Sequence, residues 1–282
     1  MNPDAIVVPS GNLSVAWATA FLRVFDAPGG ELSHPLVLTV TEFDEQREPI
    51  EIPAIRSALD ETICGINRAA GKRKIQDVSA TASTIFPHMS WSPRGPRPAQ
   101  ELFERYITQV FPRLKKLSRL NTRGTYFLRM IHATGLNGPG NKAKHVNQLG
   151  EILRWWDRDH GQTRRSALQV SLYDPAKDHT GAALSGFPCL QQVSFGYTDQ
   201  GLSVSAYYPT EYIFDRGYGN YLGLCQLGTF MAHEMKLPLN QVNVFVALPE
   251  RGGVSKAATR KLADALRPMV ADSAVAVVGG NQ

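Results

Sequence analysis

Cysteine is scarce in this sequence, and its spacing carries no motif. The 282 residues include three cysteines, Cys64, Cys189 and Cys225. An odd number without metal-ligand spacing excludes a disulfide framework and a cysteine-based zinc site, and it predicts free thiols and no bound metal. Cys64 and Cys225 fall on apolar faces of predicted helices, so we expect both to be buried in the core.

Long hydrophobic runs are also absent. No apolar stretch approaches the roughly 18 residues that a membrane-spanning helix requires. The segment Met1–Ser10 lacks the basic start and the long apolar stretch of a signal peptide. We therefore expect a cytoplasmic protein with no membrane partner.

Charge of one sign is not concentrated in any part of the chain. Lys and Arg number 30 and Asp and Glu 25, a net charge of +5, and a small positive balance suits phosphate-bearing partners. Basic and aromatic residues do not interleave, so nucleic acid is the least favoured of these partners. The composition, 43% hydrophobic and 20% charged, is typical of globular proteins, and the length suits one domain over residues 1–282.

The sequence does contain clear helical and strand periodicities. Apolar spacing predicts helices over residues 12–25, 53–70, 99–117, 146–158, 221–236 and 257–269. Alternation and β-branched content predict strands over residues 35–43, 166–172, 191–197, 202–208 and 241–247. The turn Thr198–Gly201 joins two of these strands as a hairpin. The mixture predicts an α/β (α+β) fold.

Four features between residues 162 and 246 occur in a characteristic order. The pair Arg164-Arg165 opens a predicted strand, and Pro188-Cys189 precedes the hairpin. Asn220 begins the long apolar helix, and the last predicted strand follows that helix.

This order resembles the core of the thymidylate synthase family, which reads Ser-Arg-Arg before a strand, then Pro-Cys-His, a hairpin, and Gly-x-x-x-Asn at a helix start. Upstream, Gly124-Thr125-Tyr126 with Arg129 is similar to the family's Tyr-Gly-x-Arg segment. Asn147-Gln148-Leu149 is similar to its Asp-Gln-Ile helix start. The resemblance covers residues 122–246 and is weak to absent in the first hundred residues and in the tail. It implies a thymidylate synthase-like fold, with a central mixed sheet flanked by helices and a sheet face that forms a homodimer.

The resemblance assigns Cys189 as the catalytic nucleophile. In the family, a cysteine thiolate adds to C6 of a pyrimidine nucleotide, and C5 then attacks a one-carbon unit carried by 5,10-methylenetetrahydrofolate. Such chemistry requires an accessible thiolate. The alternative is a buried structural cysteine. Tyr126 is the candidate for ordering water at the catalytic centre, and its alternative is a place in the core.

Three further residues are candidates for binding the nucleotide. Arg164 and Arg165 suit a phosphate clamp, since guanidinium forks match phosphate oxygens, and in the family this pair reaches into the partner subunit's site. Their alternative is a solvated pair. Asn220 suits base reading, because an amide can accept from N3–H and donate to O4 of uracil, which favours a uridine-type nucleotide. Its alternative is a helix N-cap.

The chain departs from the family pattern at several site positions. Leu190 stands where the family has His, and Tyr212 stands where it has Asp near the base. Pro209 replaces an arginine that holds phosphate and lowers the pKa of the cysteine. Arg216, expected on the loop before Asn220, is the candidate to replace that arginine.

The family's catalytic glutamate has no counterpart that the sequence identifies. Glu61 and Asp77 are the substitutes considered. Two interpretations follow from these departures. One is a methyl- or hydroxymethyltransferase of altered specificity, and the other is a catalytically inactive homologue that binds nucleotide or acts in an assembly.

Overall fold

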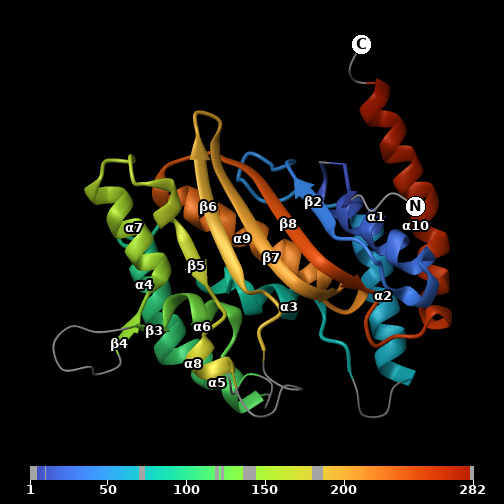
Figure 1. The fold of residues 1–282 in the computed structure, drawn as a ribbon, viewed down its shortest axis with the longest axis horizontal. Helices are drawn as coiled ribbons and strands as arrows, with labels where there is room; N and C mark the ends of the chain where they lie inside the picture. The colour runs from blue at the N-terminus through green and yellow to red at the C-terminus, as the bar shows by residue number, and fades with distance from the viewer. Residues whose placement is uncertain are drawn as a thin grey trace.

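A mixed six-stranded sheet organises the protein, and its strands run in the order β1-β2-β8-β7-β6-β5 (Figure 1). The structure is a computed structural model that describes residues 5–9, 11–69, 74–117, 121, 124–135, 144–179 and 187–279. The strands are β1 (Ile6–Val7), β2 (Leu36–Val40), β5 (Gln169–Ser171), β6 (Gln192–Thr198), β7 (Gly201–Tyr212) and β8 (Leu239–Glu250). The pairs β1–β2 and β7–β8 are parallel, and the other pairs are antiparallel.

Helices flank this sheet, so the predicted α/β class is confirmed. They are α1 (Leu13–Asp26), α2 (Pro53–Ala69), α3 (Val78–Ile85), α4 (Pro98–Arg105), α5 (Phe111–Leu117), α6 (Tyr126–Ile131), α7 (Gln148–Arg158), α8 (Pro175–Asp178), α9 (Tyr218–Met235) and α10 (Lys256–Gly279). A small hairpin of β3 (Ala133–Gly135) and β4 (Lys144–Val146) stands apart from the main sheet. No helix in the described ranges is long and apolar enough to cross a membrane.

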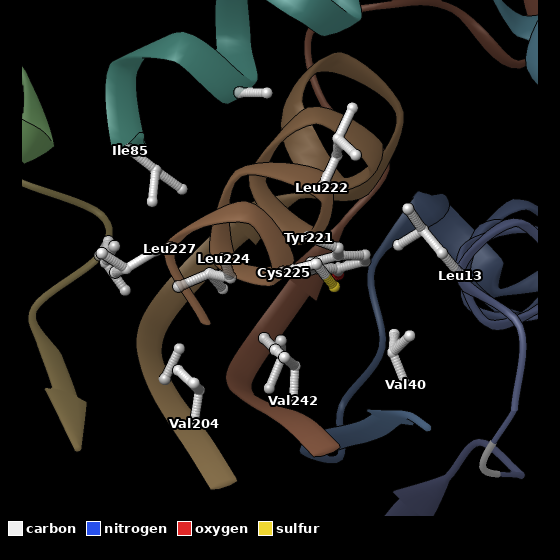
Figure 2. Packing of buried hydrophobic residues seen from close by; sticks show 14 of the residues in the cluster. Leu13, Val40, Ile85, Val204, Tyr221, Leu222, Leu224, Cys225, Leu227 and Val242 are labelled. Carbon is white, nitrogen blue, oxygen red and sulfur yellow. The ribbon is translucent and has the colours of Figure 1, made fainter. Parts of the chain in front are cut away.

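The core is built around α9. This helix packs against β7 and β8, and α1 and α3 cover its other sides. Figure 2 shows Val204 and Val242 of the sheet beneath it, with Leu13 of α1 and Ile85 of α3 beside it. A helix enclosed in this way has few polar side chains, which explains its long apolar sequence. Cys225 lies within this core, as predicted.

Two glycines allow α3 to approach α9 closely. A Cβ at Gly223 would lie 2.7 Å from the carbonyl oxygen of Ala82, and one at Gly219 would lie 2.5 Å from the Cβ of Thr81. Any larger residue at these positions would therefore push the two helices apart. This contact also fixes Thr81 beside the start of α9.

The opposite face of the sheet is open. In Figure 1 no described helix crosses the front of β6, β7 and β8. Small and polar side chains such as Ser205 and Asn243 point to this side, together with the stacked rings of Tyr207 and Phe245, whose centroids are 5.8 Å apart. The two rings are 39% and 38% exposed.

Some predicted elements differ in detail from the structure. The helix expected over residues 99–117 contains a π-helical turn, Tyr106–Val110, between α4 and α5. The strand expected over 166–172 is shorter, because a 3-10 turn over Arg165–Ala167 precedes β5. The expected helix over 146–158 begins at Gln148, since Asn147 caps it by accepting from the Gly150 amide at 2.9 Å. Neither α3 nor α6 was predicted.

The expectation that Cys64 is buried is wrong. The buried stripe of α2 consists of Ile55, Leu59 and Ile63, spaced four residues apart. Cys64 follows Ile63, so it is rotated about 100° from that stripe and is exposed.

Candidate functional site

A cavity of about 440 Å³ lies where the end of β7 meets the starts of α6 and α9. The π-helical turn Ile213–Gly217, hereafter the π-turn, links β7 to α9 and forms one wall. Thr81 and Thr84 of α3 form part of another wall, held there by the close packing of α3 on α9. We call this space the Cys189 cavity.

The structure brings together several residues that the sequence indicated separately. Cys189, Tyr126, Arg216 and Asn220 all line the Cys189 cavity. They come from the segment before β6, from α6, from the π-turn and from α9, which are distant in the sequence. Tyr126 is the first residue of α6, which Thr125 caps by accepting from the Leu128 amide at 3.2 Å. It is half-buried, lines the cavity and also packs against the hydrophobic core, so both interpretations hold in part.

The thiol of Cys189 is exposed to the cavity, and the surrounding protein raises its pKa. Partial desolvation is the largest cause, and the negative charge of Glu211 is the next. A hydrogen bond with the Tyr126 side chain and the charge of Arg216 act in the opposite direction. The thiol is therefore protonated at neutral pH in the free protein.

Glu211 lines the cavity, and sequence reasoning did not identify it. Its side chain lines the cavity but is only 2% exposed. One carboxylate oxygen accepts from Asn220 Nδ2 at 2.7 Å and the other accepts from the Tyr221 hydroxyl at 2.8 Å. Burial raises the pKa of Glu211 to about 7, while the two hydrogen bonds act to lower it. The cavity thus holds a carboxyl group that exchanges its proton near neutrality.

Asn220 does not cap α9, so its alternative interpretation as an N-cap is wrong. The π-turn leads directly into the helix, which places Asn220 at the third position of α9. Its side chain donates instead to Glu211 and is 3% exposed.

Arg216 lies in the π-turn rather than on a loop, which corrects another expectation. Its guanidinium donates to Oε1 of Gln76 and lies 3.4 Å from the hydroxyl of Thr81. Both of these partners are neutral, so neither of them offsets the positive charge of Arg216.

Arg164 and Arg165 lie outside the Cys189 cavity of their own chain. Both are exposed, and the guanidinium of Arg165 lies 5.1 Å from the centre of the Tyr197 ring.

The two residues considered as substitutes for the catalytic glutamate also lie outside the Cys189 cavity. Glu61 is exposed on α2, and Asp77 caps α3 by accepting from the Ala80 amide at 2.7 Å.

A second hollow, of about 710 Å³, lies beside Cys64 and shares Lys74 with the Cys189 cavity. We call it the Cys64 hollow. A hollow of about 720 Å³ between Arg47 and His233 contains none of the candidate residues.

Among the described residues, no group of three or more His, Cys, Asp or Glu side chains could hold a metal ion.

No protein-family model matches the chain, and no curated protein is significantly similar to it. The functional argument therefore rests on the cavity itself.

Proposed function

We propose that this protein is a thymidylate synthase-like transferase that moves a one-carbon unit to C5 of a pyrimidine nucleotide through an adduct with Cys189. One observation supports the proposal: Cys189, Asn220 and Arg216, the candidates for nucleophile, base reader and phosphate-binding cation, line one cavity. Its volume, about 440 Å³, falls within the range of small-ligand sites.

The chemistry of the cavity suits the first step of that reaction. The Cys189 sulfur would bond to C6 of the base while the electron pair of the C5–C6 double bond moves to C5 and O4. The thiol must lose its proton for this to happen, because the thiolate is the nucleophile. The thiol proton would pass to solvent in the cavity, since both oxygens of Glu211 already accept hydrogen bonds from Asn220 and Tyr221.

The resemblance implies 5,10-methylenetetrahydrofolate as the donor, and the residues at the cavity fit such a molecule. Phe187 and Tyr212 border the cavity and are 38% and 42% exposed, and aromatic side chains can pack against a planar pterin ring. Lys74, shared with the Cys64 hollow, suits the carboxylates of its glutamate tail. The folate would supply the one-carbon unit.

The homodimer is part of the proposal, and the open sheet face supports it. In most proteins both faces of a sheet are covered by other elements, or one face is polar and in contact with water. Here the open face carries the stacked pair Tyr207 and Phe245 among small polar side chains, which suits the face of a second copy. In such a dimer, the exposed Arg164 and Arg165 would reach the partner's cavity.

A catalytically inactive, nucleotide-binding homologue is the second candidate, and the state of Cys189 favours it. The pKa of the thiol is raised, and Pro209 stands where the family has an arginine that lowers it. Less thiolate at neutral pH means a weaker nucleophile.

Calorimetry with dUMP, dCMP, UMP and CMP tests the shared claim of both candidates. We expect micromolar binding of at least one nucleotide by wild type. Removing a charged hydrogen-bond donor costs about 1.5–3 kcal/mol, so Arg216→Ala should weaken binding by roughly 10- to 150-fold. The matched control Arg68→Ala, in the Cys64 hollow, should bind as wild type does.

A second variant tests the dimer. Arg165→Ala should also lose affinity, although its own cavity is intact, because the arginine would come from the partner. If none of the four nucleotides binds to wild type, the nucleotide site and both candidate functions are wrong.

A further inference from the structure

The Cys189 cavity contains an amide whose orientation is determined by a carboxylate. Asn220 donates from Nδ2 to Glu211 at 2.7 Å, and Tyr221 occupies the other carboxylate oxygen at 2.8 Å. An ionised carboxylate only accepts hydrogen bonds. The NH2 group of Asn220, and not its oxygen, must therefore face Glu211 whenever Glu211 is ionised.

This arrangement leaves a defined pair of groups for a ligand. Within the described part of the chain, the side-chain oxygen of Asn220 accepts no hydrogen bond, and one N–H of Nδ2 remains unused. Because Asn220 lines the cavity, the site offers one acceptor and one donor in a fixed order. An amide free to rotate would offer them in either order.

The two common pyrimidines differ in this order. Uracil presents a donor at N3–H next to an acceptor at O4, whereas cytosine presents an acceptor at N3 next to a donor at N4. A rotating amide pairs with both bases. An amide held in one orientation pairs with one base and meets the other with donor against donor and acceptor against acceptor.

We propose that Glu211 is the specificity-determining residue of this site, because it holds Asn220 in the orientation that reads the N3–H and O4 edge of a uracil-type nucleotide. The inference rests on the proposed function, and it adds a residue that acts through Asn220 rather than on the base. Addition of Cys189 to C6 places negative charge on O4, which the unused N–H of Asn220 would stabilise.

The variant Glu211→Gln tests this role. Glutamine keeps the shape of the side chain but has an NH2 group of its own. With the Tyr221 hydroxyl donating to the glutamine oxygen, that NH2 group faces Asn220 and turns the Asn220 amide around. The variant should fold, because the pKa of about 7 means that the native structure already accommodates a neutral Glu211.

Calorimetry with dUMP and dCMP at pH 8 gives the readout. We expect wild type to bind dUMP at least about tenfold more tightly than dCMP, the discrimination of one bidentate pair. In Glu211→Gln the ratio should fall to about threefold or less, or reverse, since a carboxylate no longer holds the amide in its wild-type orientation. Glu250→Gln is the matched control: it removes a carboxylate that accepts from Thr210 at 2.7 Å and does not line the cavity, so the wild-type ratio should remain.

Two results would overturn the inference alone: equal or tighter binding of dCMP by wild type, or an unchanged ratio in Glu211→Gln. Absence of binding by wild type to either nucleotide would instead overturn the proposed function, and the inference would fall with it.

Discussion

Cys64 and Cys189 are both exposed thiols, and the hollows beside them share Lys74. Their surroundings differ. The Cys64 hollow is lined largely by residues of α2 itself, among them Arg56 and Asp60, which pair with each other at 2.9 Å. The Cys189 cavity is lined from α3, α6, β7, the π-turn and α9. Exposure alone therefore does not separate the two thiols, whereas the convergence of distant segments around Cys189 does.

The largest expected contrast comes from the buried carboxyl group of the Cys189 cavity. The pKa of Glu211 is about 7 in the folded protein against an ordinary 4.5. Below pH 4.5 Glu211 is neutral in both the folded and the unfolded protein, so its burial does not lower the free energy of unfolding. Between pH 4.5 and 7 only the unfolded chain releases the proton, so the free energy of unfolding falls with rising pH by about 3 kcal/mol in total. Denaturant unfolding of wild type and Glu211→Gln at pH 4.5 and pH 8 should show this loss in wild type only.

The matched control lies beside Cys64. Asp60 has a side chain that is 45% exposed, so water screens its charge and Asp60→Asn should change the free energy of unfolding by less than about 1 kcal/mol. A parallel pH dependence of wild type and Glu211→Gln would contradict the account of Glu211.

Gly219, beside the Cys189 cavity, and Gly65, beside Cys64, should respond to alanine in opposite ways. Gly219→Ala places a Cβ 2.8 Å from the Val78 carbonyl oxygen, and overpacking of this kind lowers the free energy of unfolding by about 1–3 kcal/mol. A Cβ at Gly65, beside Cys64, would have no neighbouring atom within 4 Å, so Gly65→Ala should raise stability by about 0.5–1 kcal/mol through helix propensity. Urea unfolding measures both. Stabilisation by both alanines would show that α3 does not depend on this close approach.

The smallest contrast concerns the thiol itself. Tyr126→Phe removes a hydrogen bond that lowers the pKa of Cys189, so less thiolate should form at pH 8. A neutral hydrogen bond contributes about 0.5–1.5 kcal/mol, which corresponds to roughly 2- to 10-fold slower alkylation of Cys189 by iodoacetamide. Peptide mass spectrometry follows Cys64 in the same sample as the internal reference. Equal slowing of both cysteines would point to a general change in the protein instead.

The sequence predicted those parts of the fold that local periodicity determines. The apolar run of α9 and the hairpin of β6 and β7 have strong local signals, and both were found, although β7 continues to Tyr212, four residues past its expected end. Helix α3 has a sequence rich in Ser, Thr and Ala, with little periodicity of its own. It is stabilised by packing onto Gly219 and Gly223, which lie far away in the chain.

The missed carboxyl group has a local explanation. Alternation along β7 buries Val204, Ala206 and Tyr208, and its continuation would place Glu211 on the open face. The alternation breaks after Pro209, so Tyr208 and Glu211, three residues apart, are both buried. Proline lacks the N–H of a regular ladder, and such breaks are not evident from residue type alone. The position of Asn220 was misjudged for a similar reason, because the π-turn begins the helical path before the expected cap.

One measurement tests the central claim most directly: the intact mass of the protein after incubation with 5-fluoro-dUMP and 5,10-methylenetetrahydrofolate. Fluorine at C5 cannot leave as a proton does, so an adduct formed by the proposed chemistry would persist. Wild type and Cys64→Ser should each gain the mass of one nucleotide and one folate, located on the peptide that contains Cys189, and Cys189→Ser should gain neither. An adduct on Cys64, or none in wild type that binds the nucleotide, would contradict catalysis by Cys189.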